Sequence, residues 1–344
     1  MLDLIKRLCD ASGVSGSEQA IAQIITQEIK DFADIKKDRL GNIIAFKKGK
    51  KEALTKFMLC AHMDEVGLII TTITDKGLLK FDTVGGIDPR VIAGKRVFVG
   101  KNNIAGVVGV TAMHLVGSVE LKNAPSVDKL YIDIGTSTKS EAEKLVSIGD
   151  DAVFDSEFIE FGDGFIKAKA IDDRAGCAML IEMIKSDLQY DTFFVFTVQE
   201  EVGSRGAKTA TFAIKPEAAI VLEATTAADI PFVDEHKKVC FAGHGPVLSF
   251  MDKGTIYDRG LYNLACETAE QEGIPHQVKL AVAGGNDSAS VHITGEGVKT
   301  LAISLPCRYL HTASCVIKYS DAVESLKLVT KFAEKVASQN INNL

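Results

Sequence analysis

The sequence predicts an α/β fold, in which helices flank a mainly parallel sheet and a small β-barrel-like domain is inserted. Two observations carry this prediction. After residue 171, helices and buried strands alternate, which is typical of the βαβ units that build a parallel sheet. Residues 66–166 instead hold short β segments, as small barrels do. We therefore expect residues 1–65 and 167–344 to form one α/β domain and residues 66–166 to form a second.

Hydrophobic spacing defines the elements of the α/β domain. Ser17 is a good N-cap, and Ile21, Ile25 and Ile29 then fall on one face at helical spacing. Residues 192–198, TFFVFTV, are an unbroken β-branched and aromatic run, typical of a strand buried on both faces. By these criteria the expected helices are 17–32, 174–187, 204–214, 258–273 and 321–338, and the expected strands are 42–48, 56–64, 192–198, 218–224, 276–282 and 298–304.

The inserted segment is rich in short β-forming stretches. Gly, Asn and Asp residues separate these stretches and favour turns between them. The stretches are 66–86, 96–113, 129–135 and 158–170, whereas only 137–147 in this segment has the spacing of a helix.

The composition limits the class of partner. The chain has 344 residues, of which 46% are hydrophobic, and a formal net charge of −7, which argues against a nucleic-acid partner. No apolar run approaches the roughly 18 residues that cross a bilayer, and the N-terminus lacks the apolar stretch of a signal peptide. The seven cysteines form no CxxC pair, which favours reduced thiols. We expect a cytoplasmic protein without nucleic-acid or membrane partners.

Charged and histidine side chains follow the buried strands. In open α/β sheets, ligands bind at the carboxyl ends of the strands, where such side chains gather. Residues 56–64 deliver His62 and Asp64, and residues 192–198 lead directly to Glu200 and Glu201. The further candidates are Asp172, Asp173, Glu223, Arg308 and His311.

The adjacent Glu200 and Glu201 need a compensating charge. Two like charges at the end of a buried strand repel each other and lose hydration, and a cation would neutralise them. Mixed histidine and carboxylate ligands suit zinc, cobalt or manganese better than calcium or magnesium. A set of five ligands exceeds the three that one catalytic zinc usually takes, and it would suit two metals that share a carboxylate. One glutamate of the pair could then bind metal while the other serves as general base.

Five motifs together resemble those of a known enzyme family. AHMDEVG, AIDDRAG, QEEVGSRGA, VLEATTAAD and RYLHT occur here in the order found in the dinuclear aminopeptidases of clan MH. The resemblance is closest to the self-compartmentalising glutamyl and deblocking aminopeptidases, some of which are catalogued as cellulase M or endoglucanase. It runs nearly end to end and implies a zinc-peptidase-like fold. It also implies that the α/β domain is catalytic and removes N-terminal residues from short peptides with a free N-terminus.

The resemblance further implies a role for each site residue. Asp172, joined to Asp173 by a cis peptide, would bridge two divalent ions per subunit, zinc or cobalt first and manganese next. Glu200 would be the general base for a water that bridges the ions, and Asp64 would support catalysis beside His62. The implied metal ligands are His62, Asp172, Glu201, Glu223 and His311.

Two positions depart from the family pattern. Glu223 stands where the family usually has Asp, and Asn286 stands where the glycine-rich loop more often has Thr. Asp287 in this loop and Arg308 are our candidates for substrate binding.

Other functions and roles stay open at this point. A deacylase or other amidohydrolase of the same clan would use the same metals with a different pocket. A glycosidase is a weaker alternative, because metal-bound carboxylates are poor candidates for its acid–base work. A non-catalytic scaffold would be favoured by loss of Glu200 or of several ligands, and all of these are present. Asp172 and Asp173 could also act simply as a helix N-cap.

The inserted domain has an expected role in assembly. The resemblance implies dodecameric tetrahedra that assemble through such a domain. We therefore expect residues 66–166 to mediate self-association into a homo-oligomer built of dimers, a dodecamer in the first instance.

Overall fold

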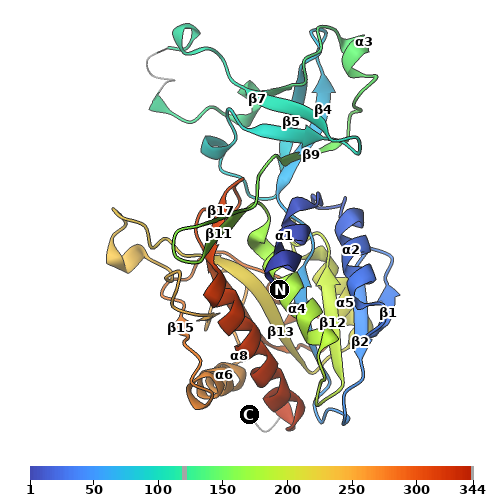
Figure 1. Ribbon diagram of the computed structural model, residues 1–344, viewed down its shortest axis with the longest axis vertical. Helices are drawn as coiled ribbons and strands as arrows, with labels where there is room; N and C mark the ends of the chain where they lie inside the picture. The colour runs from blue at the N-terminus through green and yellow to red at the C-terminus, as the bar shows by residue number, and fades with distance from the viewer. Residues whose placement is uncertain (118–121, 342–344) are drawn as a thin grey trace.

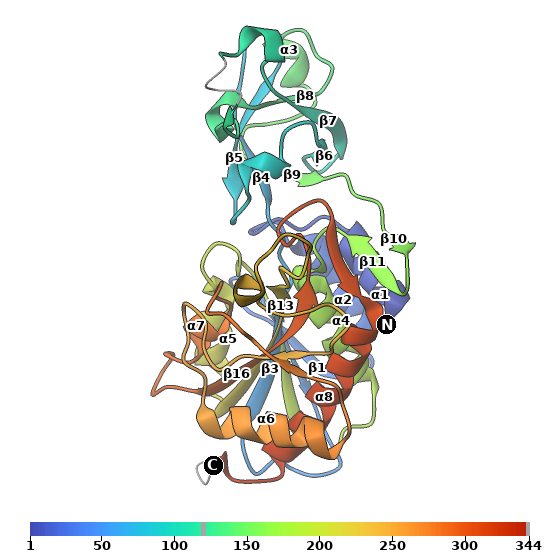
Figure 2. The ribbon, with the colours of Figure 1, turned by 90° about the vertical axis from the view of Figure 1, so that its left-hand side faces the viewer.

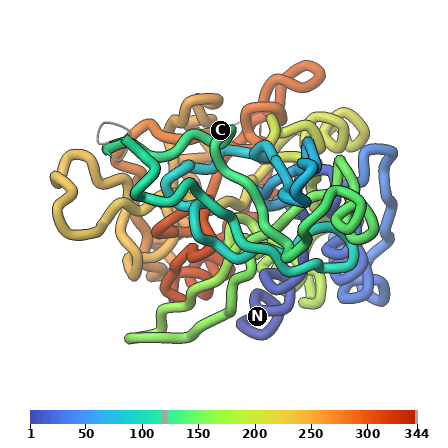
Figure 3. Tube along the Cα trace, turned by 90° about the horizontal axis from the view of Figure 1, so that it is seen from above, coloured from blue at the N-terminus to red at the C-terminus, as the bar shows by residue number. Residues whose placement is uncertain are grey.

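The computed structural model describes residues 1–117 and 122–341, in two parts stacked along the longest axis (Figure 1). The larger part holds a helix-covered sheet and both ends of the chain, and the smaller part is a barrel. Seen from above, the barrel segment lies across the top of the larger part rather than beside it (Figure 3).

The large sheet has eight strands, in the order β1-β2-β12-β3-β13-β16-β14-β15. Its four central strands, β12, β3, β13 and β16, run parallel, whereas β2 and β14 pair antiparallel to them. The predicted fold class is therefore confirmed, with antiparallel pairing towards the edges. The strands are β1 (Asp34–Lys37), β2 (Ile43–Lys47), β3 (Phe57–His62), β12 (Thr192–Thr197), β13 (Ala218–Thr226), β14 (Val247–Leu248), β15 (Gln277–Val278) and β16 (Lys299–Cys307).

Helices cover both faces of this sheet. α4 packs against β3 and β13, with α1, α2 and α8 beside it, while α5 packs on β12 and contacts α7. Figure 2 shows α5 and α7 on the opposite side of the sheet from α4. The helices are α1 (Leu2–Asp10), α2 (Gln19–Ile29), α4 (Ile171–Lys185), α5 (Arg205–Ile214), α6 (Arg259–Gln271), α7 (Ser288–Val291) and α8 (Tyr319–Ala337).

The smaller part is a closed barrel, as predicted. Its strands follow the order β4-β5-β8-β7-β6-β9 around the barrel. Apolar side chains such as Leu68, Leu79 and Ile132 fill its own core, separate from that of the large sheet. The elements are β4 (Gly67–Ile73), β5 (Leu79–Val84), β6 (Arg96–Val99), β7 (Ile104–Gly109), β8 (Tyr131–Asp133), α3 (Lys139–Ala142) and β9 (Asp151–Phe154).

Two expected elements differ in the structure. β10 (Ile159–Phe161) and β11 (Phe165–Ala168) form a sheet with β17 (Cys315–Lys318), although the expected insert extends to residue 166. Ile166 and Ile317 contribute to the core of the large part, which explains this pairing.

The strand expected over 276–282 is reduced to the two residues of β15. Its apolar residues Val278, Leu280 and Val282 are all exposed, so that a longer strand would have no buried face.

The helices of the described residues include none that is both long and apolar enough to cross a membrane.

A buried ion-pair triad joins the N-terminal segment to α4. Lys169 Nζ donates to both carboxylate oxygens of Glu65 at 2.7 and 2.8 Å, and Arg174 Nη2 donates to Glu65 Oε1 at 3.3 Å. Arg174 Nη1 also donates to the carbonyl oxygen of Leu8 at 2.6 Å, and Lys169 Nζ donates to that of Ala11 at 3.0 Å. Because all three charged side chains are buried, both cations depend on the single carboxylate of Glu65 for charge compensation.

Replacing Arg174 with Met should lower the free energy of unfolding by about 3–5 kcal/mol, because the buried carbonyl of Leu8 and the carboxylate of Glu65 would each lose a charged hydrogen-bond donor. Urea unfolding followed by circular dichroism measures this change. Arg7→Met is the matched control, since Arg7 forms an exposed pair with Glu28 and its loss should cost less than about 1 kcal/mol. Equal effects of the two substitutions would contradict the structural role of the triad.

Candidate metal centre

The five predicted metal ligands come together at one end of the large sheet. His62 ends β3, Glu223 lies in the second half of β13, and Glu201 follows β12. Asp172 lies at the beginning of α4, and His311 lies between β16 and β17. The parallel strands bring these side chains together because their carboxyl ends meet at the same edge.

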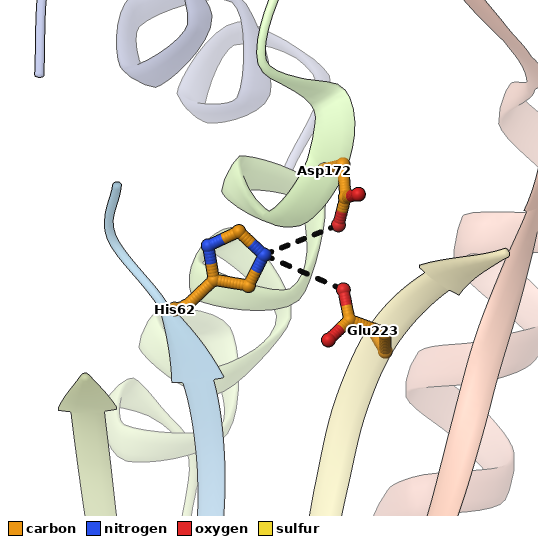
Figure 4. Close-up of side chains that lie close together, drawn as sticks. All are labelled: His62, Asp172 and Glu223. Atoms are coloured by element: carbon orange, nitrogen blue, oxygen red, sulfur yellow. Dashed lines mark hydrogen bonds and ion pairs between the residues drawn. The ribbon is translucent and has the colours of Figure 1, made fainter. Parts of the chain in front are cut away.

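The first cluster consists of His62, Asp172 and Glu223, which point towards one another from β3, α4 and β13 (Figure 4). Nε2 of His62 lies 3.2 Å from Oδ1 of Asp172 and 3.4 Å from Oε1 of Glu223. The three ligand atoms lie within 4.8 Å of one another, and all three residues are buried.

The second cluster consists of Asp172, Glu201 and His311. Nε2 of His311 lies 3.4 Å from Oδ2 of Asp172 and 3.5 Å from Oε2 of Glu201. Asp172 therefore belongs to both clusters and presents a different carboxylate oxygen to each histidine.

The residue after Asp172 has a separate role in the helix. The peptide bond between Asp172 and Asp173 is cis, as the family resemblance implied. Oδ1 of Asp173 accepts a hydrogen bond from the backbone N–H of Gly176 at 3.0 Å, within the first turns of α4. One aspartate of the pair thus faces the clusters while the other binds the helix backbone.

Both histidines are oriented by backbone carbonyl groups. Nδ1 of His62 lies 3.0 Å from the carbonyl oxygen of Asp64, and Nδ1 of His311 lies 2.8 Å from that of Gly86. A hydrogen bond from each Nδ1–H to its carbonyl leaves Nε2 free to act as a ligand. Gly86 follows strand β5 of the barrel, so the barrel segment contributes directly to the site.

Asp64 contacts both His62 and the backbone of the glutamate pair. Its Oδ1 accepts the backbone N–H of Glu200 at 3.0 Å, and its Oδ2 accepts that of Glu201 at 3.1 Å. Oδ1 is also 3.5 Å from Nδ1 of His62, and Oδ2 accepts the Ser15 hydroxyl at 2.6 Å. Burial would raise the pKa of Asp64, but the hydrogen bond with His62 and its other donors lower it.

Glu200 is the free member of the glutamate pair. Its carboxylate accepts a hydrogen bond from the Ser204 hydroxyl at 3.3 Å and belongs to neither cluster. Glu200 instead lines a cavity of about 330 Å³, which is also bordered by Asp172, Glu201 and Glu223. Burial raises the pKa of Glu200 well above its usual range, although the charge of His62 opposes the shift.

The charges of the two clusters fit divalent cations. Burial raises the pKa of Glu223 well above its usual range and that of Glu201 to about 7. Burial alone would lower the pKa of His311, but Asp172 and Glu201 outweigh it and raise the pKa to about 10. These raised pKa values mean that protons offset the negative charge of the clustered carboxylates. A bound cation would replace the protons and keep the carboxylates ionised. Each cluster offers one imidazole nitrogen and two carboxylate oxygens, a donor set that suits zinc, cobalt or manganese.

The two proposed substrate-binding residues do not line this cavity. Asp287 is buried at the beginning of α7, where Oδ2 accepts the Thr197 hydroxyl at 2.5 Å. Arg308 forms two hydrogen bonds of 2.7 Å with Asp229. Each side chain is therefore engaged with a partner within the chain.

Other side chains complete the cavity wall. Asn286, the neighbour of Asp287, lines the cavity. Lys279 also lines it, at a position where the sequence predicted a longer strand. The sequence signal that could have identified Lys279 as a site residue is its position as a single charged residue within an apolar stretch. The remaining lining residues are Gly86, Ala224, Thr225, Thr226, Ala283, Gly284, Gly285, Ser304, Leu310 and His311.

Comparison with known sequences identifies a family. The model of the M42 glutamyl aminopeptidase family matches residues 41–328. A putative aminopeptidase of Acetivibrio thermocellus is 42% identical over 96% of this chain and 98% of its own. The lysyl aminopeptidase of Pyrococcus furiosus is 33% identical over 97% of each chain.

A solved structure gives the same assignment. The TET1 peptidase of Pyrococcus horikoshii, which can assemble into a tetrahedron or a large octahedral shell, is 34% identical. It superposes with a TM-score of 0.86 over 98% of this chain and 99% of its own. The predicted family is therefore confirmed: the chain belongs to the M42 glutamyl aminopeptidases and is a metal-dependent aminopeptidase.

Proposed function

We propose that this enzyme removes N-terminal residues from short peptides with two divalent metal ions and with Glu200 as general base. The observation that carries the proposal is the shared carboxylate of Asp172. Its Oδ1 lies 3.2 Å from Nε2 of His62, and its Oδ2 lies 3.4 Å from Nε2 of His311. A carboxylate between two clusters is the arrangement that dinuclear hydrolases use.

The ligands divide between the two ions. His62 and Glu223 would hold one ion, Glu201 and His311 would hold the other, and Asp172 would contact both. Although Glu223 is longer than the usual Asp, its Oε1 reaches to 3.4 Å from His62 Nε2. Zinc or cobalt is the first choice for these ligands, and manganese is the next. When bound, such ions polarise a substrate carbonyl and lower the pKa of water towards neutrality.

Glu200 would move the proton. Its carboxylate lines the cavity beside both clusters and is not one of their ligands. A carboxylate in this position can accept a proton from water and pass it to the leaving amine. Asp64 would keep Glu200 in place through the backbone N–H at 3.0 Å. The family match favours this reaction over the deacylase and scaffold alternatives.

We also propose that the expected insert, residues 66–166, mediates assembly into a dodecamer. The barrel stands apart from the large sheet (Figure 2). Met113 and Leu115, which lie between strands β7 and β8 of the barrel, are 75% and 70% exposed. Exposed apolar groups of this kind are typical of subunit contacts. The tetrahedral assembly of the Pyrococcus horikoshii relative supports the dodecamer. All seven cysteines are free, which supports a cytoplasmic location.

Glu200→Gln should lower kcat by about 10²–10⁴-fold, because the base is lost while the metal ligands remain. The assay is hydrolysis of free and N-acetylated aminoacyl amides by metal-loaded protein, with bound metal measured by mass spectrometry. We expect the wild-type enzyme to cleave the free amides alone and the variant to keep its metal. Glu201→Gln is the matched control and should lose metal. Cleavage of only the acetylated amides by the wild type, or near-wild-type activity of Glu200→Gln, would contradict the proposal.

His311→Ala should reduce the bound metal from two ions per chain to one, because the second cluster loses its imidazole. Protein stripped with a chelator would be titrated with zinc, cobalt or manganese. His276→Ala serves as control, since Nδ1 of His276 contacts the carbonyl of Ile274 and the residue belongs to neither cluster. Saturation of the wild type by a single ion would rule out the dinuclear centre.

Sedimentation should give a particle of about twelve times the chain mass of 37.0 kDa. The double substitution Met113→Asp and Leu115→Asp should shift the protein to smaller species, since it places charges in the exposed apolar segment. Leu54→Asp, at an exposed position of the large part, should leave the particle intact. A metal-loaded wild-type monomer at micromolar concentration would contradict the assembly.

A further inference from the structure

One wall of the cavity beside the metal clusters carries a buried lysine. Lys279 is only 6% exposed and lines the same cavity of about 330 Å³ as Glu200 and Glu223. It is the only Lys or Arg among the lining residues that the structure describes. The chain reaches this position directly after the short strand β15.

The ammonium group of Lys279 is incompletely satisfied. Nζ donates to the carbonyl oxygen of Ala283 at 2.7 Å, and it forms no ion pair with a carboxylate in the described part of the chain. A lysine ammonium has three N–H donors, so two remain available. Burial lowers the pKa of Lys279, and the charge of Asp252 opposes this shift. A buried cation without a close anion is costly, which makes a ligand anion favourable here.

Asp252, whose charge opposes the burial-induced lowering of the Lys279 pKa, is already engaged. Oδ1 of Asp252 accepts the backbone N–H groups of Gly254 and Thr255, both at 2.8 Å. Its Oδ2 accepts the hydroxyl of Tyr257 and lies 3.4 Å from Nδ2 of Asn286. This carboxylate therefore stabilises the loop that supports Asn286 and does not pair with Lys279.

We propose that Lys279 binds the carboxylate of an acidic side chain at the N-terminal residue of the substrate. The enzyme then prefers peptides that begin with Glu or Asp; this inference rests on the aminopeptidase function proposed above. A charge-assisted hydrogen bond with the carboxylate would use the free donors of Lys279, whereas a lysyl side chain would meet a like charge. The two metal ions would offset the charges of their carboxylate ligands, so the clusters would not repel an acidic substrate.

Family membership leaves this preference undecided. The family is described as glutamyl aminopeptidases, yet the Pyrococcus furiosus relative at 33% identity is a lysyl aminopeptidase. The two names refer to side chains of opposite charge. The cavity wall of this chain therefore carries the argument.

The alternative role for Lys279 is structural. Its hydrogen bond to Ala283 could simply hold the segment from Leu280 to Gly285 against the cavity. If Lys279 had only this structural role, its substitution would weaken cleavage of every substrate to the same extent. Loss of a specificity group would instead change the ratio between acidic and neutral substrates.

The test compares kcat/KM for the p-nitroanilides of Glu, Gln, Asp, Leu and Lys, using the metal-loaded oligomer. We expect the wild type to favour Glu over the isosteric Gln by about ten- to a hundredfold, as for one hydrogen bond to a charged group. Lys279→Met should bring this ratio close to one, mainly through a higher KM for Glu. Lys279→Glu should favour Lys over Gln.

Lys253→Met is the matched control, since Lys253 is exposed and its backbone N–H donates to Gly284 in the same loop. It should keep the wild-type ratio. A wild type that cleaves Gln or Lys as well as Glu would overturn the inference even if the Lys279 variants fail to fold. A Lys279→Met enzyme with an unchanged ratio would also overturn it. Absence of cleavage of all five substrates would overturn the proposed function and this inference with it.

Discussion

The carboxylate of Asp172 is the contact on which both candidate metal sites depend. Each of its oxygens lies within 3.4 Å of a different histidine, so a small displacement would disturb both clusters. The residue is fixed by α4, the helix that packs against β3 and β13 and is buried along nearly its whole length. Arg174 in the same helix reaches the N-terminal segment through the carbonyl of Leu8. The core of the large part thus holds the shared ligand in place.

A single buried carboxylate holds the backbone of the two adjacent glutamates. Asp64 binds the backbone N–H of both Glu200 and Glu201, which fixes the turn that follows β12. From this turn both side chains line the cavity, where Oε2 of Glu201 lies 3.5 Å from Nε2 of His311 and Glu200 accepts a hydrogen bond from Ser204. The two like charges still interact, because the charge of Glu201 adds to the effect of burial in raising the pKa of Glu200. The proposed function divides metal binding and proton transfer between these two neighbouring residues.

The site was more predictable from the sequence than the details around it. His62, Glu201 and Glu223 adjoin buried runs such as TFFVFTV, so the strand ends alone placed them at one edge. The pairing of β11 with β17 joins segments about 150 residues apart and leaves no local signal. Lys279 lies in an apolar stretch that looks like a strand, yet its apolar neighbours are exposed, and burial is a tertiary property. The contact of Arg308 with Asp229 likewise depends on the folded chain.

The barrel also contributes to the candidate site, because its strand β5 leads into a pair of glycines beside the two clusters. The carbonyl of Gly86 lies 2.8 Å from Nδ1 of His311 and orients that side chain. Gly85 has a φ of +81°, and a Cβ there would lie 2.8 Å from Val66 Cγ1 and 3.2 Å from Glu201 Cβ. A larger residue would be strained and would press on a second ligand. The end of a barrel strand and two ligands of the second cluster must therefore fit together as one unit.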